Sequence, residues 1–174
     1  MAAQLEAAVL TLFAGPTHEA QAYCDAVKQS PESWRLCWEV FLSSARLEAR
    51  FWCLQVLVEK TTHSGAVGHV RPEDVVVLRQ EAVRFACHGA ESLPDPSLKN
   101  KLAVLVTRLV QCDYPVRWPT AFRELGSAPP DFFLRFLATL DQEVFSEEAG
   151  PREAQERQKS NDMKASWAGE LGEN

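Results

Sequence analysis

The stretch Cys112–Pro119, which reads CDYPVRWP, places an aromatic residue before a proline twice, at Tyr114-Pro115 and at Trp118-Pro119. A residue that precedes proline is disfavoured in the helical conformation, and proline itself cannot continue a helix interior. The stretch can therefore be a corner between two packed elements. Proline-rich segments also dock on aromatic grooves as ligands, and the surrounding pattern decides between these two interpretations.

On both sides of the corner, apolar residues recur with the period of an α-helix, and no segment alternates like a half-buried strand. Thr17 is suited to cap a helix that runs to about Gln29, and Ser30 followed by Pro31 is suited to begin the next. Gly89 is suited to end a later helix, and Asp131 to cap the last one. The pattern predicts eight helices, over residues 2–13, 16–29, 31–43, 46–61, 72–89, 96–112, 116–126 and 129–146.

The spacing of these helices predicts an all-α fold, a HEAT-repeat α-α superhelix (solenoid) of about three to four helix pairs. We expect residues 16–29 to pair with 31–43, 46–61 with 72–89, 96–112 with 116–126, and 129–146 with a weak last segment. A compact helical bundle is the alternative. The run Phe51-Trp52-Cys53-Leu54 is apolar on more than one helix face, which is typical of a helix packed on both sides and favours the solenoid.

The character of the sequence changes after Val144. We expect a domain over residues 1–146, followed by a polar tail over 147–174 that is either a partial further repeat or disordered. A solenoid needs a polar cap at each end, and this sequence shows none at its C-terminus. The expectation is that the chain either continues in nature or is a truncated product.

Composition limits the possible functions. Apolar residues make up 46% of the chain, enough for a core, and the net charge of −6 opposes free-standing nucleic-acid binding. Five widely spaced cysteines without a CxxC pair argue against a disulfide framework or a zinc site. His63 and His69 share a loop, but no cluster completes a metal shell. No nucleotide-binding or hydrolase motif, signal peptide or membrane span is present, so we expect no enzyme, cofactor or metal.

Charged residues recur on the predicted second helix of each pair. Arg35 and Glu39 lie one helical turn apart and are expected to face outward together, whereas Trp34 and Trp38 beside them are expected in the core. In a helical solenoid the second helices of successive pairs line one face. The residues expected to form a partner-binding strip there are Arg35, Glu39, Arg79, Arg84 and Arg123, with Arg117 of the corner as a further candidate for partner contact, and scattered solvated charges are the alternative.

Four ordered stretches resemble the N-terminal region of the importin-β superfamily in its exportin-type form. The first is KNKLA at 99–103 with the corner Tyr114, Pro115, Trp118, Pro119 and Phe122, which is specific for the superfamily. The others narrow the resemblance to the exportin-T family, with exportin-5 as the nearest rival. They are RFWCLQVL at 50–57, SPESWRLC at 30–37 and FLRFLATLDQE at 133–143. The resemblance covers residues 16–146, and the aromatic-proline stretch is then a structural corner.

The resemblance implies a non-catalytic carrier that shuttles between nucleus and cytoplasm, binds the small GTPase Ran in its GTP form, exports transfer RNA and contacts nucleoporins. It also implies that second helices of the first repeats face Ran, which coincides with the strip of charged residues above. In the family, most transfer-RNA contacts lie in further repeats, so weak or absent RNA binding is expected for this chain alone. A generic HEAT scaffold that binds a protein helix or peptide is the other hypothesis.

Overall fold

The computed structural model describes residues 1–62 and 69–145, and this part of the chain contains helices and no strands. The helices are α1 (Ala2–Ala14), α2 (His18–Gln29), α3 (Trp34–Ser43), α4 (Leu47–Thr61), α5 (Pro72–His88), α6 (Pro96–Asp113), α7 (Ala121–Leu125) and α8 (Pro130–Leu140). Short turns η1 (Pro31–Ser33) and η2 (Ala90–Ser92) precede α3 and α6, and a π-helical turn, η3 (Asp141–Phe145), follows α8. The all-α prediction is confirmed. The predicted polar tail at 147–174 lies outside the described residues.

Most helix ends follow from local signals. Thr17 caps α2 as predicted, because its side-chain oxygen accepts a hydrogen bond from the Ala20 backbone N–H. Gly89 follows α5 as its C-cap, also as predicted. Asp131 is not the cap of α8. Pro129 occupies that position, and Asp131 lies in the first turn of the helix, where a negative charge is also favourable.

Two predicted helix starts were wrong by a few residues. Ser30 and Pro31 begin a 3₁₀ turn, and α3 itself starts at Trp34. The helix after the corner starts at Ala121, whereas residue 116 was predicted, because Trp118 precedes a proline and is kept out of the helical conformation.

The predicted pairing of the helices was wrong by one helix. The observed neighbours are α1 with α2, α3 with α4, and α5 with α6, while α7 packs on α5 and α8 on α6. The reason is the length of the connections. Only residues 44–46 join α3 to α4, and a connection this short forces consecutive helices to pack as an antiparallel pair. The longer segment between Thr61 and Pro72 leads from one pair to the next.

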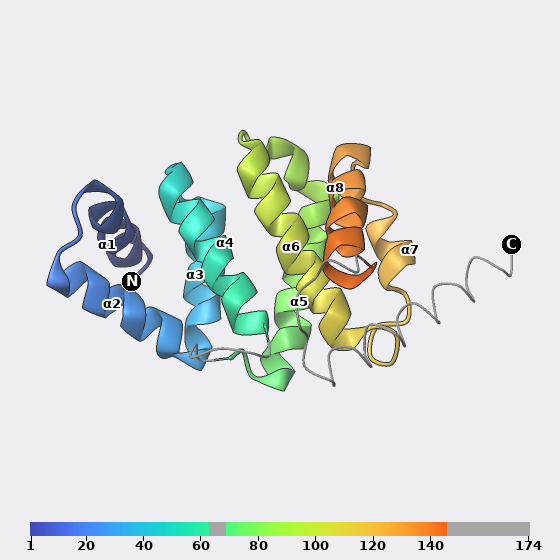
Figure 1. The fold of residues 1–174 in the computed structure, drawn as a ribbon, viewed down its shortest axis with the longest axis horizontal. Coiled ribbons are helices and arrows are strands. Elements are labelled where there is room, and N and C mark those ends of the chain that lie inside the picture. Colours follow the sequence, from blue (N-terminus) through green and yellow to red (C-terminus); the bar gives the residue numbers. More distant parts are fainter. Residues whose placement is uncertain (63–68, 146–174) are drawn as a thin grey trace, which may run out of the picture.

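The helices form two rows. The first row contains α3, α5 and α7, and the second row contains α4, α6 and α8, with α1 packed against α3 and α4 at one end (Figure 1). In each central pair the earlier helix belongs to the first row. The charged residues predicted on second helices therefore lie on the first helices of the observed pairs.

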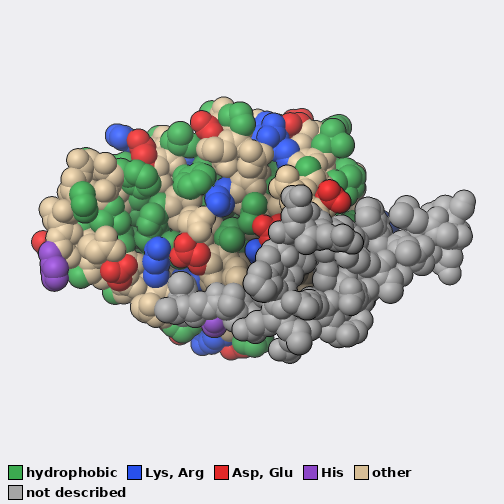
Figure 2. Space-filling model, in the orientation of Figure 1, with side chains coloured by type: hydrophobic (Ala, Val, Ile, Leu, Met, Phe, Trp, Pro, Cys, Tyr) green, Lys and Arg blue, Asp and Glu red, His purple; other side chains and the backbone are tan. Residues whose placement is uncertain are grey.

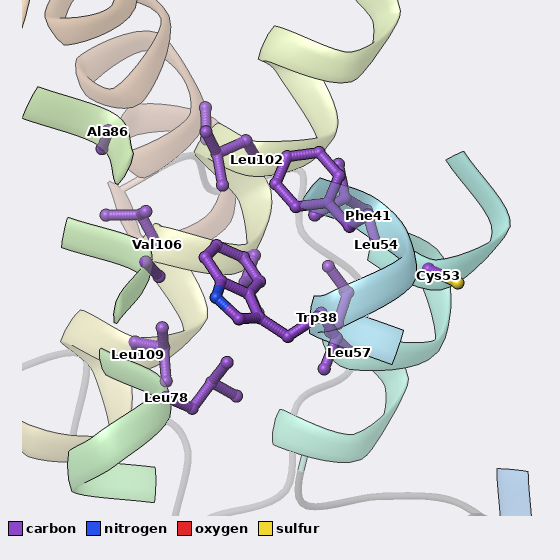
Figure 3. Close-up of a cluster of buried hydrophobic side chains, with 14 of the residues drawn as sticks. Trp38, Phe41, Cys53, Leu54, Leu57, Leu78, Ala86, Leu102, Val106 and Leu109 are labelled. Carbon is purple, nitrogen blue, oxygen red and sulfur yellow. The ribbon is translucent and has the colours of Figure 1, made fainter. Parts of the chain in front are cut away.

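The core lies between the rows and runs continuously through them. Trp38 projects from α3 toward Leu78 of α5 and Val106 and Leu109 of α6 (Figure 3), and it is buried, as is Trp34. Phe85 contacts the rings of Trp38 and Phe41 at centroid distances of 6.0 and 5.2 Å, which joins α5 to α3 within the first row. The prediction that both tryptophans belong to the core is confirmed.

The helix α4 is packed on more than one side, as its sequence predicts. It contacts α3, α6 and α1, and its buried residues include Ala49, Cys53, Val56 and Leu57. Arg50 fastens the start of this helix to its partner, since its Nε donates a hydrogen bond of 2.9 Å to the Phe41 carbonyl oxygen near the end of α3.

A buried lysine holds the far end of α4. Lys60 Nζ donates hydrogen bonds of 2.7 Å to the carbonyl oxygens of Lys28 and Ser30, at the C-terminus of α2. Burial lowers the pKa of Lys60, although the charge of Glu59 opposes this effect. An ammonium group at this end of α2 also interacts favourably with the helix dipole. The contact connects α2 to α4 although the two helices are distant in sequence.

Candidate partner-binding surface

The first row exposes most of the charged side chains that the sequence predicts as a strip. The side chain of Arg35 on α3 is 63% exposed and that of Arg84 on α5 is 70% exposed. Glu39 on α3 and Arg123 on α7 are also exposed. These four residues lie on one row of helices and are accessible to a partner.

Arg79 differs from the other members of the predicted strip. Its side chain is only 13% exposed, and its Nη1 lies 2.5 Å from an oxygen of Asp113 at the end of α6. Its guanidinium also lies 5.1 Å from the ring centroid of Trp118. Because the ion pair and the ring contact both lie inside the protein, Arg79 joins α5 to the corner and offers little surface to a partner.

The carboxylate of Asp113 is almost completely buried between two arginines. Its second oxygen lies 2.8 Å from Nη2 of Arg117, whose side chain is 56% exposed. Arg117 also donates a hydrogen bond of 2.9 Å to the Cys112 carbonyl oxygen. A buried carboxylate at the negative end of a helix requires such compensation, since both burial and the dipole disfavour its charge.

A second buried carboxylate orients Arg35. Asp74, in the first turn of α5, binds Nη2 of Arg35 and Nη2 of Arg71, each at 2.8 Å. Burial by itself raises the pKa of Asp74, but the hydrogen bond and charge of Arg71 and the charge of Arg35 outweigh it, so the pKa is lowered overall. The Arg35 guanidinium also lies 5.0 Å from the Trp34 ring centroid, so its position on the surface is fixed.

The aromatic-proline stretch is a corner. The helix α6 ends at Asp113, and Tyr114 adopts an extended conformation before a cis peptide bond to Pro115. The Tyr114 ring lies 5.1 Å from that of Phe122, which lies 6.1 Å from Phe136 of α8. Trp118 faces Arg79 of α5. Tyr114 thus packs on Phe122 of α7 and Trp118 on Arg79 of α5, and Pro115 and Pro119 turn the chain between them.

An open groove of about 600 Å³ lies between α5 and the corner. Arg79, Arg84 and His88 line it from α5, and Arg117, Trp118 and Pro119 line it from the other side. The groove was not predicted, because the corner and α5 are distant in the sequence. The recurrence of arginines along the sequence was the one feature that could have indicated a site there.

The second row has a surface of a different kind. Figure 2 shows the molecule in the orientation of Figure 1, with acidic, basic and apolar side chains interspersed. Most of its charged side chains are paired between neighbouring helices. The pairs are Lys101 with Gln55, Lys99 with Asp131, Arg135 with Asn100, Arg108 with Glu143 and, from α2, Lys28 with Glu59. These contacts connect neighbouring helices of the second row.

The described residues contain no cluster suited to a metal ion, and two of the buried thiols are poorly suited to nucleophilic chemistry. Across residues 1–62 and 69–145, no group of His, Cys, Asp and Glu side chains is placed to hold a metal ion, and His63 lies outside these ranges. A hydrogen bond with Cys37 and burial both raise the pKa of Cys53, and burial raises that of Cys24 to about 11. These thiols stay protonated near neutral pH and are poor nucleophiles. None of the described helices is long and apolar enough to cross a membrane.

Known proteins match the chain over most of this architecture. A family model described as exportin 1-like protein matches residues 95–171. The chain is 35% identical over 150 residues to exportin-T of Oryza sativa subsp. japonica, covering 79% of this chain and 15% of the relative. Exportin-T of Arabidopsis thaliana is 28% identical over 142 residues, which cover 74% of this chain and 14% of the relative. Exportin-T of Dictyostelium discoideum is 28% identical over 135 residues, which cover 74% of this chain and 12% of the relative. The matched region thus spans less than a sixth of each relative.

The paired helices and these matches place the chain in the class of exportin-type helical proteins of the importin-β superfamily. Within that class, the chain belongs to the exportin-T family.

Proposed function

We propose that the chain acts as the N-terminal part of a nuclear export receptor, which binds Ran in its GTP form and carries transfer RNA from the nucleus to the cytoplasm. The observation that carries the proposal is its membership of the exportin-T family over 79% of its length. Two rows of paired helices fit the start of a HEAT-repeat superhelix, in which each repeat contacts only its neighbours.

The proposed contact with Ran is the exposed part of the first row, formed by Arg35, Glu39, Arg84 and Arg123. Arg79 lies beneath this surface, where its ion pair with Asp113 joins α5 to the end of α6. The charged side chains of the second row are largely occupied in pairs between helices, whereas Glu39 and Arg123 project from the first row without such an ion pair in the described residues. Binding at the first row therefore disturbs fewer contacts within the protein.

The proposed mechanism is a binding cycle without catalysis by this chain. Ran-GTP and transfer RNA each favour the same curvature of the superhelix, so each raises the affinity for the other. Hydrolysis of GTP in the cytoplasm removes this coupling and releases both, and contacts with nucleoporins carry the receptor through the nuclear pore. With its net charge of −6, this chain alone binds transfer RNA weakly or not at all.

The test is a pull-down of the chain, and of the full-length gene product, with Ran loaded with GTP or with GDP. The proposal predicts retention of the GTP form and little retention of the GDP form. Equal retention of both forms, or retention of neither by the full-length product, would remove the proposal and leave a generic helical-repeat scaffold.

A further inference from the structure

The helix α8 is apolar on two sides. Its core side holds residues that recur at every fourth position and are buried, namely Phe132, Phe136 and Leu140. A second set of apolar residues, which we call the α8 flank, consists of Phe133, Leu134, Leu137 and Ala138. Phe133 and Leu137 are partly buried at the edge of the core, whereas Leu134 is 65% exposed and Ala138 is also exposed. The α8 flank therefore extends the apolar surface of the helix beyond the core.

The α8 flank is directed away from α6. On the polar side of α8, Arg135 donates a hydrogen bond of 2.6 Å to the side-chain oxygen of Asn100 on α6. An oxygen of Asp131, on the same side, lies 3.0 Å from Nζ of Lys99. At 3.6 residues per turn, Phe133 lies about 160° around the helix from Arg135. In the part of the chain that the structure describes, α6 is the one helix on which α8 packs extensively, and α8 ends the second row (Figure 1).

A helix that is apolar on two sides is typically covered on both. The helix α4 illustrates this rule, since it contacts α3, α6 and α1. The α8 flank is also a contiguous patch of four side chains and not a single exposed apolar residue, and contiguous patches mark contact surfaces. We therefore looked for a segment that could cover it.

The segment that follows η3 carries an apolar stripe of its own. Most of residues 147–174 are polar, but Met163, Trp167 and Leu171 recur at every fourth position, which is the spacing of one helix face. The family model that matches α6, α7 and α8 continues through Leu171, so these helices and this segment belong to one region of the family. A helix with so narrow a stripe is marginal in water alone, and packing of the stripe on another apolar surface is what stabilises it.

Covalent attachment favours this segment over a free molecule. The helix α8 has 11 residues and is about 16 Å long at a rise of 1.5 Å per residue. A flexible chain as long as residues 146–162 spans roughly 20–25 Å on average, so Met163 can reach every position of the α8 flank. A connection of this kind gives an effective concentration on the order of millimolar. A second copy of the chain, at lower concentration, competes poorly with it.

We propose that residues 152–171 cover the α8 flank, with Met163, Trp167 and Leu171 packed against Leu134 and its apolar neighbours. This contact lies within the chain and on a different surface from the proposed Ran contact. It requires neither Ran nor RNA.

The test is limited trypsin digestion of the 174-residue chain, with the products identified by mass spectrometry. Lys159 and Lys164 are cleavage sites inside the segment, and cleavage there reports how often the segment leaves the α8 flank. Leu134→Asp places a charge in the flank, and Trp167→Asp places one in the stripe. Leu42→Asp is the matched control, because it makes the same change at a leucine that is 45% exposed on α3, in the other row.

Cleavage after Lys159 and Lys164 should be at least about tenfold faster in Leu134→Asp and in Trp167→Asp than in the unaltered chain, since a buried charge opposes the contact. Leu42→Asp should change these rates less than about twofold. The variant with both Leu134→Asp and Trp167→Asp should be cleaved no faster than either single variant, because each substitution alone breaks the same contact. Cleavage after Arg108 of α6 reports unfolding of the helices themselves and should stay slow in all variants.

Three results would overturn the proposal. They are cleavage of the unaltered chain as fast as that of Trp167→Asp, equal effects of Leu134→Asp and Leu42→Asp, and protection that is lost on dilution, which would mean that a second copy covers the flank. Trp167→Asp lies outside the described helices, so it keeps the test decisive if Leu134→Asp unfolds α8. Because the assay contains neither Ran nor RNA, its failure is distinguishable from failure of the proposed export function.

Discussion

Two buried carboxylates, each held between two arginines, organise the first row at the scale of single residues. Asp74 binds Arg71 and Arg35 at the start of α5, and Asp113 binds Arg79 and Arg117 at the end of α6. The arginines stand out in the sequence, but their partners do not. An aspartate in a helical sequence is ordinarily solvated, and only the tertiary packing places these two inside.

We predict that Asp113→Ala strongly destabilises the fold. The substitution leaves Arg79 as a largely buried cation without its carboxylate, and breaking a buried pair in this way costs about 3–5 kcal/mol. The free energy of unfolding, measured by urea denaturation, should fall by about that amount. Arg84→Ala is the control, because its exposed pair with Glu81 is worth about 0–1 kcal/mol. Similar losses for the two variants would show that Asp113 is not a structural anchor.

The lowered pKa values of aspartates predict how stability depends on pH. Arg71 and Arg35 hold the pKa of Asp74 below its usual range despite its burial, and hydrogen bonds from Arg135 and Lys99 lower that of Asp131. In the unfolded chain an aspartate titrates near about 3.9. The stabilisation is therefore complete above that value and is lost as the pH falls through the lower pKa of the folded state.

The measurement is the free energy of unfolding as a function of pH. The contribution of these two aspartates to the free energy of unfolding should be nearly constant from about pH 5 to neutrality. Below about pH 5 it should decrease as the pH falls. Asp74→Asn should make the decrease shallower, because one of the responsible groups no longer titrates. An unchanged slope in that variant would contradict the role of Asp74.

At the scale of helices, local chemistry predicts where elements begin and end. Thr17 at α2, Gly89 after α5 and the two X-Pro steps of the corner act through neighbouring backbone atoms, so the sequence alone reveals them. The start of α3 was less predictable. Ser30-Pro31 is suited to an α-helix and to a 3₁₀ turn alike, and the Ser33 hydroxyl settles the turn by donating to the carbonyl oxygens of Val27 and Ser30.

We predict that Thr17→Ala destabilises the protein by about 1 kcal/mol, because the Ala20 N–H loses its acceptor at the start of α2. Thr17→Ser keeps the hydroxyl oxygen and should change stability by only a few tenths of a kcal/mol. Thermal unfolding of both variants, with amide exchange in the first turn of α2, checks the expectation. Equal midpoints for the two variants would mean that the cap is unimportant.

At the scale of the whole molecule, the number of helices and the all-α fold class could be predicted from the sequence. Which helices pack against each other as pairs could not. Apolar periodicity shows which face of α4 or α6 is buried, yet it does not say which helix covers that face. The three-residue connection from α3 to α4 was the available signal for the correct pairing. The candidate strip was nevertheless predicted as one set, because Arg35, Arg84 and Arg123 all lie on the first row whichever way the helices are paired.

The most direct test of the proposed function is a calorimetric titration of the full-length gene product with Ran-GTP, comparing substitutions that change the charge in each of the two rows. We predict that Glu39→Lys and Arg123→Glu on the first row each weaken binding about tenfold, or about 1.4 kcal/mol. Asn100→Glu, at an exposed position of α6 in the second row, should change binding less than about twofold. Unchanged binding in the first-row variants, together with weakened binding in Asn100→Glu, would contradict the assignment of the first row as the Ran contact.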